Sequence, residues 1–218
     1  LGVTVVREHA HFSAPDTISS PTARVKARRI IIATGSKAFV PPIPGIETVP
    51  YLTNETLFDV DELPRHLIIL GGGPIGMEMA QAFRRLGSEV TVIEMGRVLA
   101  KSDADHAEIA YQALTHEGVR ILQNHKAASV SRDGDTLIVE ADGKEGKQIV
   151  RGSHLLVAAG RKAITEGLAL DAGNVETDDQ GIRVGDNLRS VSNKRVWALG
   201  DVAGKGQFTH LAGWHGSV

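Results

Sequence analysis

The sequence contains no cysteine, which excludes disulfides, thiolate nucleophiles and cysteine-ligated metals within these residues. It also has no apolar run near the ~20 residues that a membrane span requires. Its first residues lack the charged head and the apolar core of a signal peptide. We therefore expect a cytoplasmic protein without a membrane partner.

Neither sign of charge is in large excess, since the formal net charge is −2. A surface without a basic excess gives no electrostatic reason to expect a nucleic-acid partner. The 218 residues suffice for one large or two modest domains, each with its own core. The chain starts with Leu1 rather than methionine, so we expect a fragment of a longer protein.

A glycine-rich turn between two apolar runs is the most informative feature. Residues 66–70 (HLIIL) predict a strand, residues 71–76 (GGGPIG) a turn that opens a helix, and residues 89–94 (EVTVIE) a second strand. Gly87 is expected to end the helix. One helix face is predicted to cover the sheet, made of Ile75, Met79, Ala82, Phe83 and Leu86.

Each glycine of this G-x-G-x-x-G turn has a physical role in binding a dinucleotide. Gly71 permits the tight turn, Gly73 lets the backbone approach a pyrophosphate, and Gly76 lets the helix lie close on the strand. Pro74 suits a first helical turn. The helix start, which includes Ile75, presents unpaired amides and the positive dipole end to phosphate.

Glu94 follows Gly76 by eighteen residues, close to the ~20 expected for the acid that binds an adenosine ribose. A carboxylate accepts from both ribose hydroxyls but repels a 2′-phosphate, so we predict NAD(H) rather than NADP(H). Arg97, three residues on, is an alternative partner for a 2′-phosphate. Substitution of Glu94 distinguishes the two cofactors.

The flanking sequence predicts further short elements. Before the turn we expect a β-meander with strands near 3–6, 9–12, 16–19, 24–27 and 29–33, a proline-rich linker at 40–45 and a short helix at 54–58. After Glu94 we expect a helix capped by Ser102 and strands near 119–122, 127–131, 136–141, 148–150 and 154–159. Beyond Arg161 we expect a hairpin at 179–184, a strand at 195–199 and a helix that Thr209 caps.

Two polar clusters invite metal-site readings that we do not adopt. His9 and His11 share one face of a predicted strand, but no carboxylate is fixed beside them, so a solvated strand is favoured. The acidic residues Asp103, Asp105 and Glu108 lie where they stabilise a helix N-terminus, which we favour over Mg²⁺ binding. No metal site is predicted.

Three separated motifs occur in a specific order: residues 33–35 (ATG) after a strand, the unit from Gly71 to Glu94, and residues 196–201 (VWALGD) with 209–212 (THLA) behind them. Together they resemble the pyridine nucleotide-disulfide oxidoreductases, the two-dinucleotide-binding flavoproteins, and within them most the dihydrolipoyl dehydrogenases and their mercuric reductase relatives. The resemblance covers essentially the whole chain.

The resemblance implies an α/β fold in which a Rossmann-like NAD-binding domain, βαβαβ plus a β-meander, is inserted into a partial FAD-binding domain. The implied domains are residues 65–187 for NAD, with 1–64 and 188–218 as pieces of the FAD domain. Asp201 is the implied partner of the FAD ribityl chain. The other implied FAD-binding residues are Ala33, Thr34, Gly35, Gly200, His210, Leu211 and Ala212.

Three further residues take roles from the resemblance alone. Glu78 matches a helix glutamate that faces nicotinamide and flavin, and is assigned as catalytic, with a solvated helix face as the alternative. Gly160 and Arg161 match an NAD-binding motif, although Ala163 and Ile164 replace the proline and asparagine that usually follow.

The implied parent is an FAD-dependent enzyme that moves hydride between NAD(H) and FAD and reduces a disulfide substrate, as a homodimer formed through a C-terminal domain. The family's redox-active cysteine pair is absent here. We therefore expect these residues alone to bind nucleotide without turnover. The alternatives are a non-catalytic NADH-binding module, or a ferredoxin reductase, rubredoxin reductase, NADH oxidase or mercuric reductase relative.

Overall fold

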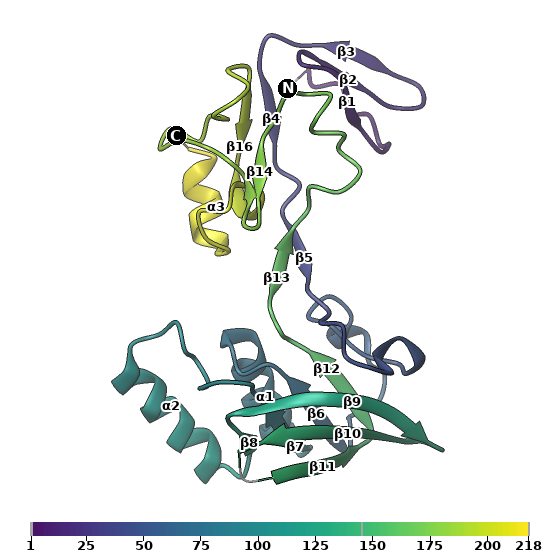
Figure 1. The fold of residues 1–218 in the computed structure, drawn as a ribbon, viewed down its shortest axis with the longest axis vertical. Helices are drawn as coiled ribbons and strands as arrows, with labels where there is room; N and C mark the ends of the chain where they lie inside the picture. The colour runs from purple at the N-terminus through teal and green to yellow at the C-terminus, as the bar shows by residue number, and fades with distance from the viewer. Residues whose placement is uncertain (1, 145, 218) are drawn as a thin grey trace. The chain divides into compact units, whose positions relative to one another are not determined.

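The computed structural model describes residues 2–144 and 146–217 (Figure 1). The chain divides into two compact units. The first unit comprises residues up to 37 together with those from 161 onward, and the second comprises residues 38–160. None of the helices in the described ranges is long and apolar enough to cross a membrane.

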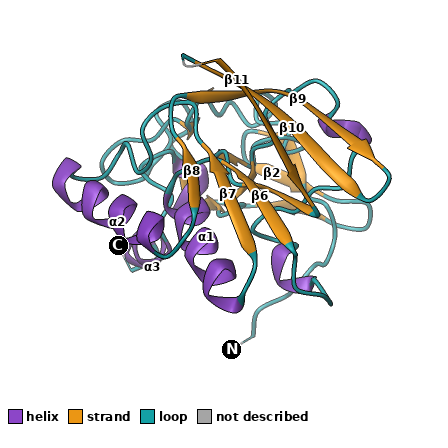
Figure 2. Cartoon of the chain, turned by 90° about the horizontal axis from the view of Figure 1, so that it is seen from below, coloured by secondary structure: helices purple, strands orange, loops and turns teal. Residues whose placement is uncertain are grey.

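A four-stranded parallel sheet forms the centre of the second unit. Its order is β12 (His154–Val157), β6 (His66–Leu70), β7 (Glu89–Ile93) and β8 (Arg120–Leu122). Helices α1 (Pro74–Leu86) and α2 (Ala104–His116) connect successive strands of this sheet, as Figure 2 shows. The expected strand–helix–strand–helix–strand order is therefore present, and β12 adds a fourth parallel strand.

The predicted meander also forms, as the antiparallel sheet β11-β10-β9 made of β9 (His125–Asp133), β10 (Thr136–Gly143) and β11 (Gly146–Gly152). The parallel sheet packs against this meander on one face and against helix α1 on the other. Alternate residues of β6 show this, because Ile68 belongs to the core with Val139 and Leu67 to the core with Phe83. Burial on both faces explains the uninterrupted apolar run of β6.

The buried face of α1 differs from the predicted one. Its buried residues are Gly76, Met77, Ala80 and Phe83, whereas the predicted members Ala82 and Leu86 are exposed. Two of the four buried residues, Gly76 and Ala80, are small and let the helix axis approach the sheet closely. Gly87 ends the helix as predicted, in the left-handed conformation with φ 112°.

Helix α2 begins one residue later than predicted. The capping residue is Asp103 rather than Ser102, because the Asp103 carboxylate accepts from the backbone N–H of Asp105 and His106. Ala107 and Leu114 form the buried face of this helix.

Residues 38–64 belong to the second unit, so the compact units divide near residues 38 and 160. Long-range backbone bonds explain this, since Leu52 donates to Leu155 and accepts from Val157, and Val130 donates to Pro44. The predicted helix at 54–58 is a single 3-10 turn, η2 (Leu57–Asp59), and a similar turn, η1 (Ile46–Thr48), precedes it.

The first unit consists of small sheets. A meander, β1 (His11–Ala14), β2 (Thr17–Ser19) and β3 (Arg24–Lys26), precedes a parallel pair of β4 (Ile30–Ile32) and β16 (Val196–Ala198). The pairs β5 (Ser36–Ala38) with β13 (Arg161–Ala163) and β14 (Thr177–Asp178) with β15 (Gly181–Ile182) complete it.

Three expectations for the first unit are wrong. Residues 3–6, predicted as a strand, are exposed and form no strand with any residue that the structure describes. The strand at 29–33 does not close the meander, since β4 pairs with β16 instead. Thr209 is the first residue of α3 (Thr209–His215) rather than its cap, which is Phe208. A 3-10 turn, η3 (Gly200–Ala203), lies between β16 and α3.

Candidate functional site

The turn after β6 requires glycine at its first position. Gly71 has φ 111°, a conformation that other residues rarely adopt, and its N–H donates to the Ile93 carbonyl at 2.9 Å. A Cβ atom on Gly71 would overlap the backbone carbonyl of Ala158. The turn is therefore held between the ends of β7 and β12, at the carboxyl edge of the parallel sheet.

Gly73 and Gly76 do different work in the same turn. A Cβ atom on Gly76 would overlap the Gly71 carbonyl oxygen, so Gly76 permits the close approach of α1 to the turn. Around Gly73 no atom lies within 4 Å of where a Cβ would stand, and its φ of −74° suits any residue. Gly73 therefore leaves bare main chain facing open space, which is what a bound diphosphate needs.

The start of α1 offers free donors at this surface. Pro74 takes the first helical position, and the Gly73 cap provides no side-chain acceptor. Within the part of the chain that the structure describes, no group accepts from the backbone N–H of Gly73, Ile75 or Gly76. These donors add to the positive end of the helix dipole, so the turn fits an anionic group.

Glu94 lies at the end of β7 beside this turn, where its half-buried carboxylate binds two backbone amides. One oxygen accepts from Gly72 at 2.7 Å and the other from Gly96 at 2.8 Å. Each carboxylate oxygen has two acceptor sites, so capacity remains for two hydroxyls. The sequence analysis did not assign Gly72 or Gly96 as partners of Glu94, although Gly72 lies in the glycine-rich turn and Gly96 is two residues after Glu94. Arg97 is exposed and pairs with no described residue.

A second polar cluster lies in the first unit, around Asp201. Ser36 donates to the Asp201 carboxylate at 2.5 Å, and Arg161 donates to the Ser36 hydroxyl at 2.7 Å. The Arg161 guanidinium also lies 3.9 Å from the Asp201 carboxylate and donates to the Ser36 carbonyl. Arg161 thus joins a residue assigned to FAD, whereas the sequence assigned it to NAD. Sequence reasoning missed Ser36, which directly follows the 33–35 motif.

The other residues assigned to FAD lie around the ends of β4 and β16. Thr34 donates to the Ile164 carbonyl at 2.6 Å, and Gly35 accepts from the Ile164 amide, which holds the segment that begins at Ala33. The Gly200 amide donates to the buried ring of His215 at 3.1 Å. His215 therefore fixes the turn that carries Asp201.

The remaining predicted residues lie at the surface of their units. His210 is exposed and its ring stacks on Phe208, with 5.4 Å between centroids, while Leu211 and Ala212 are half-buried in α3. Glu78 is exposed on α1 and pairs with no described residue. Gly160 has φ 129°, and its carbonyl accepts from the Phe39 amide. Gly160 is two residues after Ala158, whose carbonyl borders Gly71.

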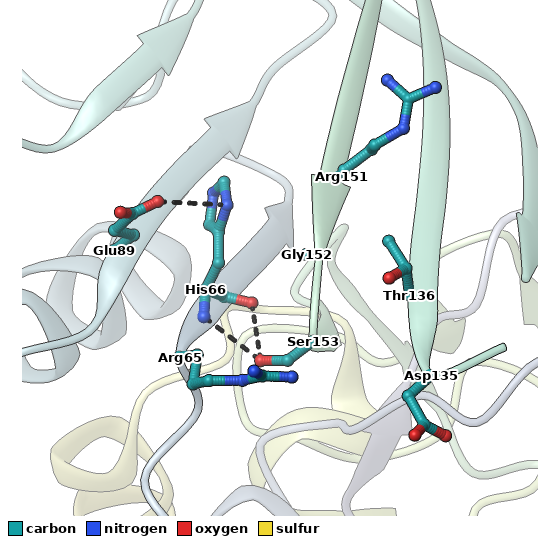
Figure 3. Close-up of a pocket in the computed structure, with 8 residues that line it drawn as sticks. All are labelled: Arg65, His66, Glu89, Asp135, Thr136, Arg151, Gly152 and Ser153. Carbon is teal, nitrogen blue, oxygen red and sulfur yellow. Dashed lines mark hydrogen bonds and ion pairs between the residues drawn. The ribbon is translucent and has the colours of Figure 1, made fainter. Parts of the chain in front are cut away.

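A pocket of about 260 Å³ opens at the opposite, amino-terminal edge of the parallel sheet (Figure 3). His66 is central to it: its ring bonds the Thr91 hydroxyl at 2.9 Å and lies 3.6 Å from the Glu89 carboxylate. Burial lowers the pKa of His66; Glu89 opposes this and Arg120 adds to it. The other lining residues are Arg65, Asp135, Thr136, Arg151, Gly152 and Ser153.

The lowered pKa of His66 predicts an acid-sensitive fold. The unfolded chain takes up this proton near its ordinary pKa of about 6.5, before the folded chain does. The His66 contribution to the free energy of unfolding is therefore complete above about 6.5 and is lost as pH falls towards the folded pKa. We expect His66→Gln to flatten the pH dependence of urea unfolding between pH 7.5 and 5.5; an unchanged slope would contradict the assignment.

Comparisons with known proteins agree with these features. A family model described as pyridine nucleotide-disulphide oxidoreductase matches residues 1–216. The mercuric reductase of Streptomyces lividans is 39% identical over 197 residues, 90% of this chain and 42% of its own length. The mercuric reductase of Bacillus cereus is 34% identical over 218 residues, 100% of this chain and 34% of its own length.

Solved structures lead to the same family. The flavoprotein disulfide reductase RclA from Escherichia coli, in a Cu(II) complex, matches with a TM-score of 0.89 and 31% identity, over 97% of this chain and 48% of its own. LpdA from Mycobacterium tuberculosis matches with a TM-score of 0.87 and 29% identity, over 99% of this chain and 49% of its own. The chain thus spans half or less of these relatives, and it belongs to the pyridine nucleotide-disulphide oxidoreductase family.

Proposed function

We propose that this chain is the nucleotide-binding part of an FAD-dependent disulfide oxidoreductase that passes hydride between NAD(H) and FAD. Members of its family use FAD and NAD(P)H. The observation that carries the proposal is the turn at residues 71–76. There, backbone N–H groups without acceptors and the open space at Gly73 lie beside the Glu94 carboxylate. On this reading the second unit is the Rossmann-like NAD-binding domain and the first unit is part of the FAD-binding domain.

The second unit would hold NAD(H) in two parts. The diphosphate would accept from the amides of Gly73 and Ile75 at the positive end of α1. The adenosine ribose would donate its hydroxyls to the free acceptor sites of Glu94. Because both carboxylate oxygens already accept from backbone amides, the side chain is oriented before the ligand arrives, which favours NAD(H) over NADP(H).

The first unit fits FAD through the cluster around Asp201. The Asp201 carboxylate stands after β16, where Ser36 and Arg161 hold one of its oxygens. Acceptor capacity therefore remains for a sugar-alcohol hydroxyl of the ribityl chain. A bound FAD would supply the acceptor for hydride from the reduced nicotinamide. Proximity and orientation drive that transfer, so no protein base is needed, and Glu78 is proposed only to line the path.

Two kinds of electron acceptor remain open for the longer protein. A disulfide is the substrate that the family name implies, and the mercuric reductase relatives favour a mercuric ion as the second candidate. Both would involve cysteine thiols, and this chain has no cysteine. Assaying the longer protein for NADH oxidation with lipoamide, a disulfide, and separately with mercuric ion would choose between them.

Purified chain tests the proposal directly. We expect the fluorescence of NADH to change on binding, and we expect the protein to be colourless, because a chain that carries only part of the FAD-binding domain should not retain flavin. Added NAD+ should displace NADH. A folded chain that leaves NADH fluorescence unchanged would contradict the proposal.

A further inference from the structure

A strongly cationic pocket lies in the first unit, and the nucleotide sites do not use it. Its volume is about 440 Å³, within the range of about 300–1,000 Å³ that small-molecule sites occupy. Five of its six lining residues are cationic, the sixth is aromatic and none is acidic. These residues are Arg28, Arg29, Arg189, Lys194, Arg195 and Trp197.

The topology separates this pocket from the cluster around Asp201. Strands β4 and β16 are parallel, with Ile30 opposite Val196. Arg29 directly precedes β4 and Arg195 directly precedes β16, so both stand at the amino edge of the pair. Asp201 follows β16 at the carboxyl edge. A ligand in the cationic pocket therefore would not occupy the place proposed for flavin.

Arg189 is held in position by groups that do not neutralise its positive charge. Its guanidinium lies over the Trp197 ring, 5.1 Å from the centroid. Its Nε donates to the Lys194 carbonyl at 2.7 Å, and its Nη2 donates to the same oxygen. An isolated antiparallel bridge pairs the backbone of Arg189 with that of Trp197, which places Arg189 beside β16. Its partners are a neutral carbonyl and a ring face, so the positive charge remains available to an anion.

The other cations of the pocket are also uncompensated. Among the residues that the structure describes, no carboxylate lies within ion-pair distance of Arg28, Arg29, Lys194 or Arg195. Arg195 does influence one acid, Asp16: the Thr17 hydroxyl, then Lys26 and then Arg195 lower the pKa of its carboxyl. Asp16 pairs with Lys26 at 3.4 Å rather than with a pocket residue. Like charges gathered around one concavity repel each other, and a multivalent anion would relieve that repulsion.

We propose that this cationic pocket binds a small ligand that carries a diphosphate group. Arginine presents planar pairs of donors that match phosphate oxygens, and three arginines besides the stacked Arg189 surround the cavity. The proposal is independent of the nucleotide assignments at Gly71 and Asp201. Trp197 on the pocket wall supplies an optical signal for binding.

The test uses Trp214→Phe as the background, which leaves Trp197 as the remaining tryptophan. Trp214 is 57% exposed, so the change should not disturb folding. Pyrophosphate is titrated at fixed ionic strength with saturating NADH, and Trp197 fluorescence is followed. We expect saturable binding that weakens by about tenfold or more in Arg28→Ala/Arg29→Ala, because several charge-assisted bonds are lost. Both arginines are exposed in a bend, so the variant should fold.

The matched control is Arg7→Ala/Arg24→Ala, which removes the same charge from exposed positions that do not line the pocket. It should bind pyrophosphate within about twofold of the background, the effect expected of long-range charge alone. ADP forms a second arm: binding tighter than pyrophosphate identifies a nucleotide ligand, and equal binding identifies the diphosphate group alone. Binding of either ligand supports the proposal only if Arg28→Ala/Arg29→Ala weakens or abolishes that binding.

Three results would overturn the proposal. One is pyrophosphate binding that is no tighter than sulfate binding at the same ionic strength. Another is equal weakening in the pocket variant and in the matched control, which would indicate a general charge effect. The third is a signal that persists in Arg28→Ala/Arg29→Ala, which would place the anion elsewhere on the chain.

Discussion

Replacing Glu94 with alanine is expected to weaken NADH binding by about tenfold or more. A hydrogen bond to a charged group contributes about 1.5–3 kcal/mol, and about 1.4 kcal/mol corresponds to a tenfold change in affinity. NADPH should lose less, or gain, because the carboxylate that repels a 2′-phosphate is removed. Titrations that follow NADH and NADPH fluorescence give the ratio of the affinity for NADH to the affinity for NADPH. This ratio should be lower in the variant than in the wild type.

The same substitution also removes the acceptor of two backbone amides. The N–H groups of Gly72 and Gly96 would lose their partner, at a cost of about 1–3 kcal/mol for the buried Gly72 donor. Stability is therefore measured separately by urea unfolding, and Glu94→Gln is included because its amide oxygen keeps one acceptor. Glu89→Ala, at the opposite end of β7, is the matched control and should bind NADH normally. An unchanged NADH to NADPH ratio in Glu94→Ala would contradict the role of Glu94.

Alanine substitutions at Gly76 and Gly73 should fail in different ways. At Gly76 the new Cβ would overlap the backbone carbonyl of Gly71, so α1 must shift away from the turn. We expect a loss of about 1–3 kcal/mol in the free energy of unfolding, typical of overpacking, together with loss of NADH binding. At Gly73 the Cβ meets no atom within 4 Å and φ is −74°, so stability should be unchanged.

NADH binding should nevertheless weaken by about tenfold or more in Gly73→Ala, because the methyl group would stand where the diphosphate approaches the backbone. The pair of variants thus separates a defect of packing from a defect of binding. Urea unfolding and NADH titration on both variants make the comparison. Wild-type NADH affinity in a folded Gly73→Ala variant would show that the diphosphate does not lie at this turn.

The parallel sheet could be predicted because its residues depend on local patterns. Residues 66–70 are apolar without alternation, and β6 is indeed covered on both faces. The face of α1 was mispredicted because a pattern search favours large apolar residues such as Leu86, which is 65% exposed. The helix instead approaches the sheet through Gly76 and Ala80, where the small side chains allow close packing.

The unit boundaries and the cluster around Asp201 depend on contacts between distant residues. The proline-rich segment has little local structure, yet Pro44 accepts from Val130 and joins the second unit. Ser36 and Asp201 are separated by 165 positions, and no local pattern pairs them. Motif order indicated Asp201, but only the fold shows that Ser36 and Arg161 hold its carboxylate.

A crystal structure of the chain with NADH bound would test the nucleotide assignment most directly. We expect the diphosphate against the amides of Gly73 and Ile75, and the adenosine ribose hydroxyls within hydrogen-bond distance of the Glu94 carboxylate. Coenzyme bound elsewhere on the chain, with Glu94 still occupied only by Gly72 and Gly96, would contradict it.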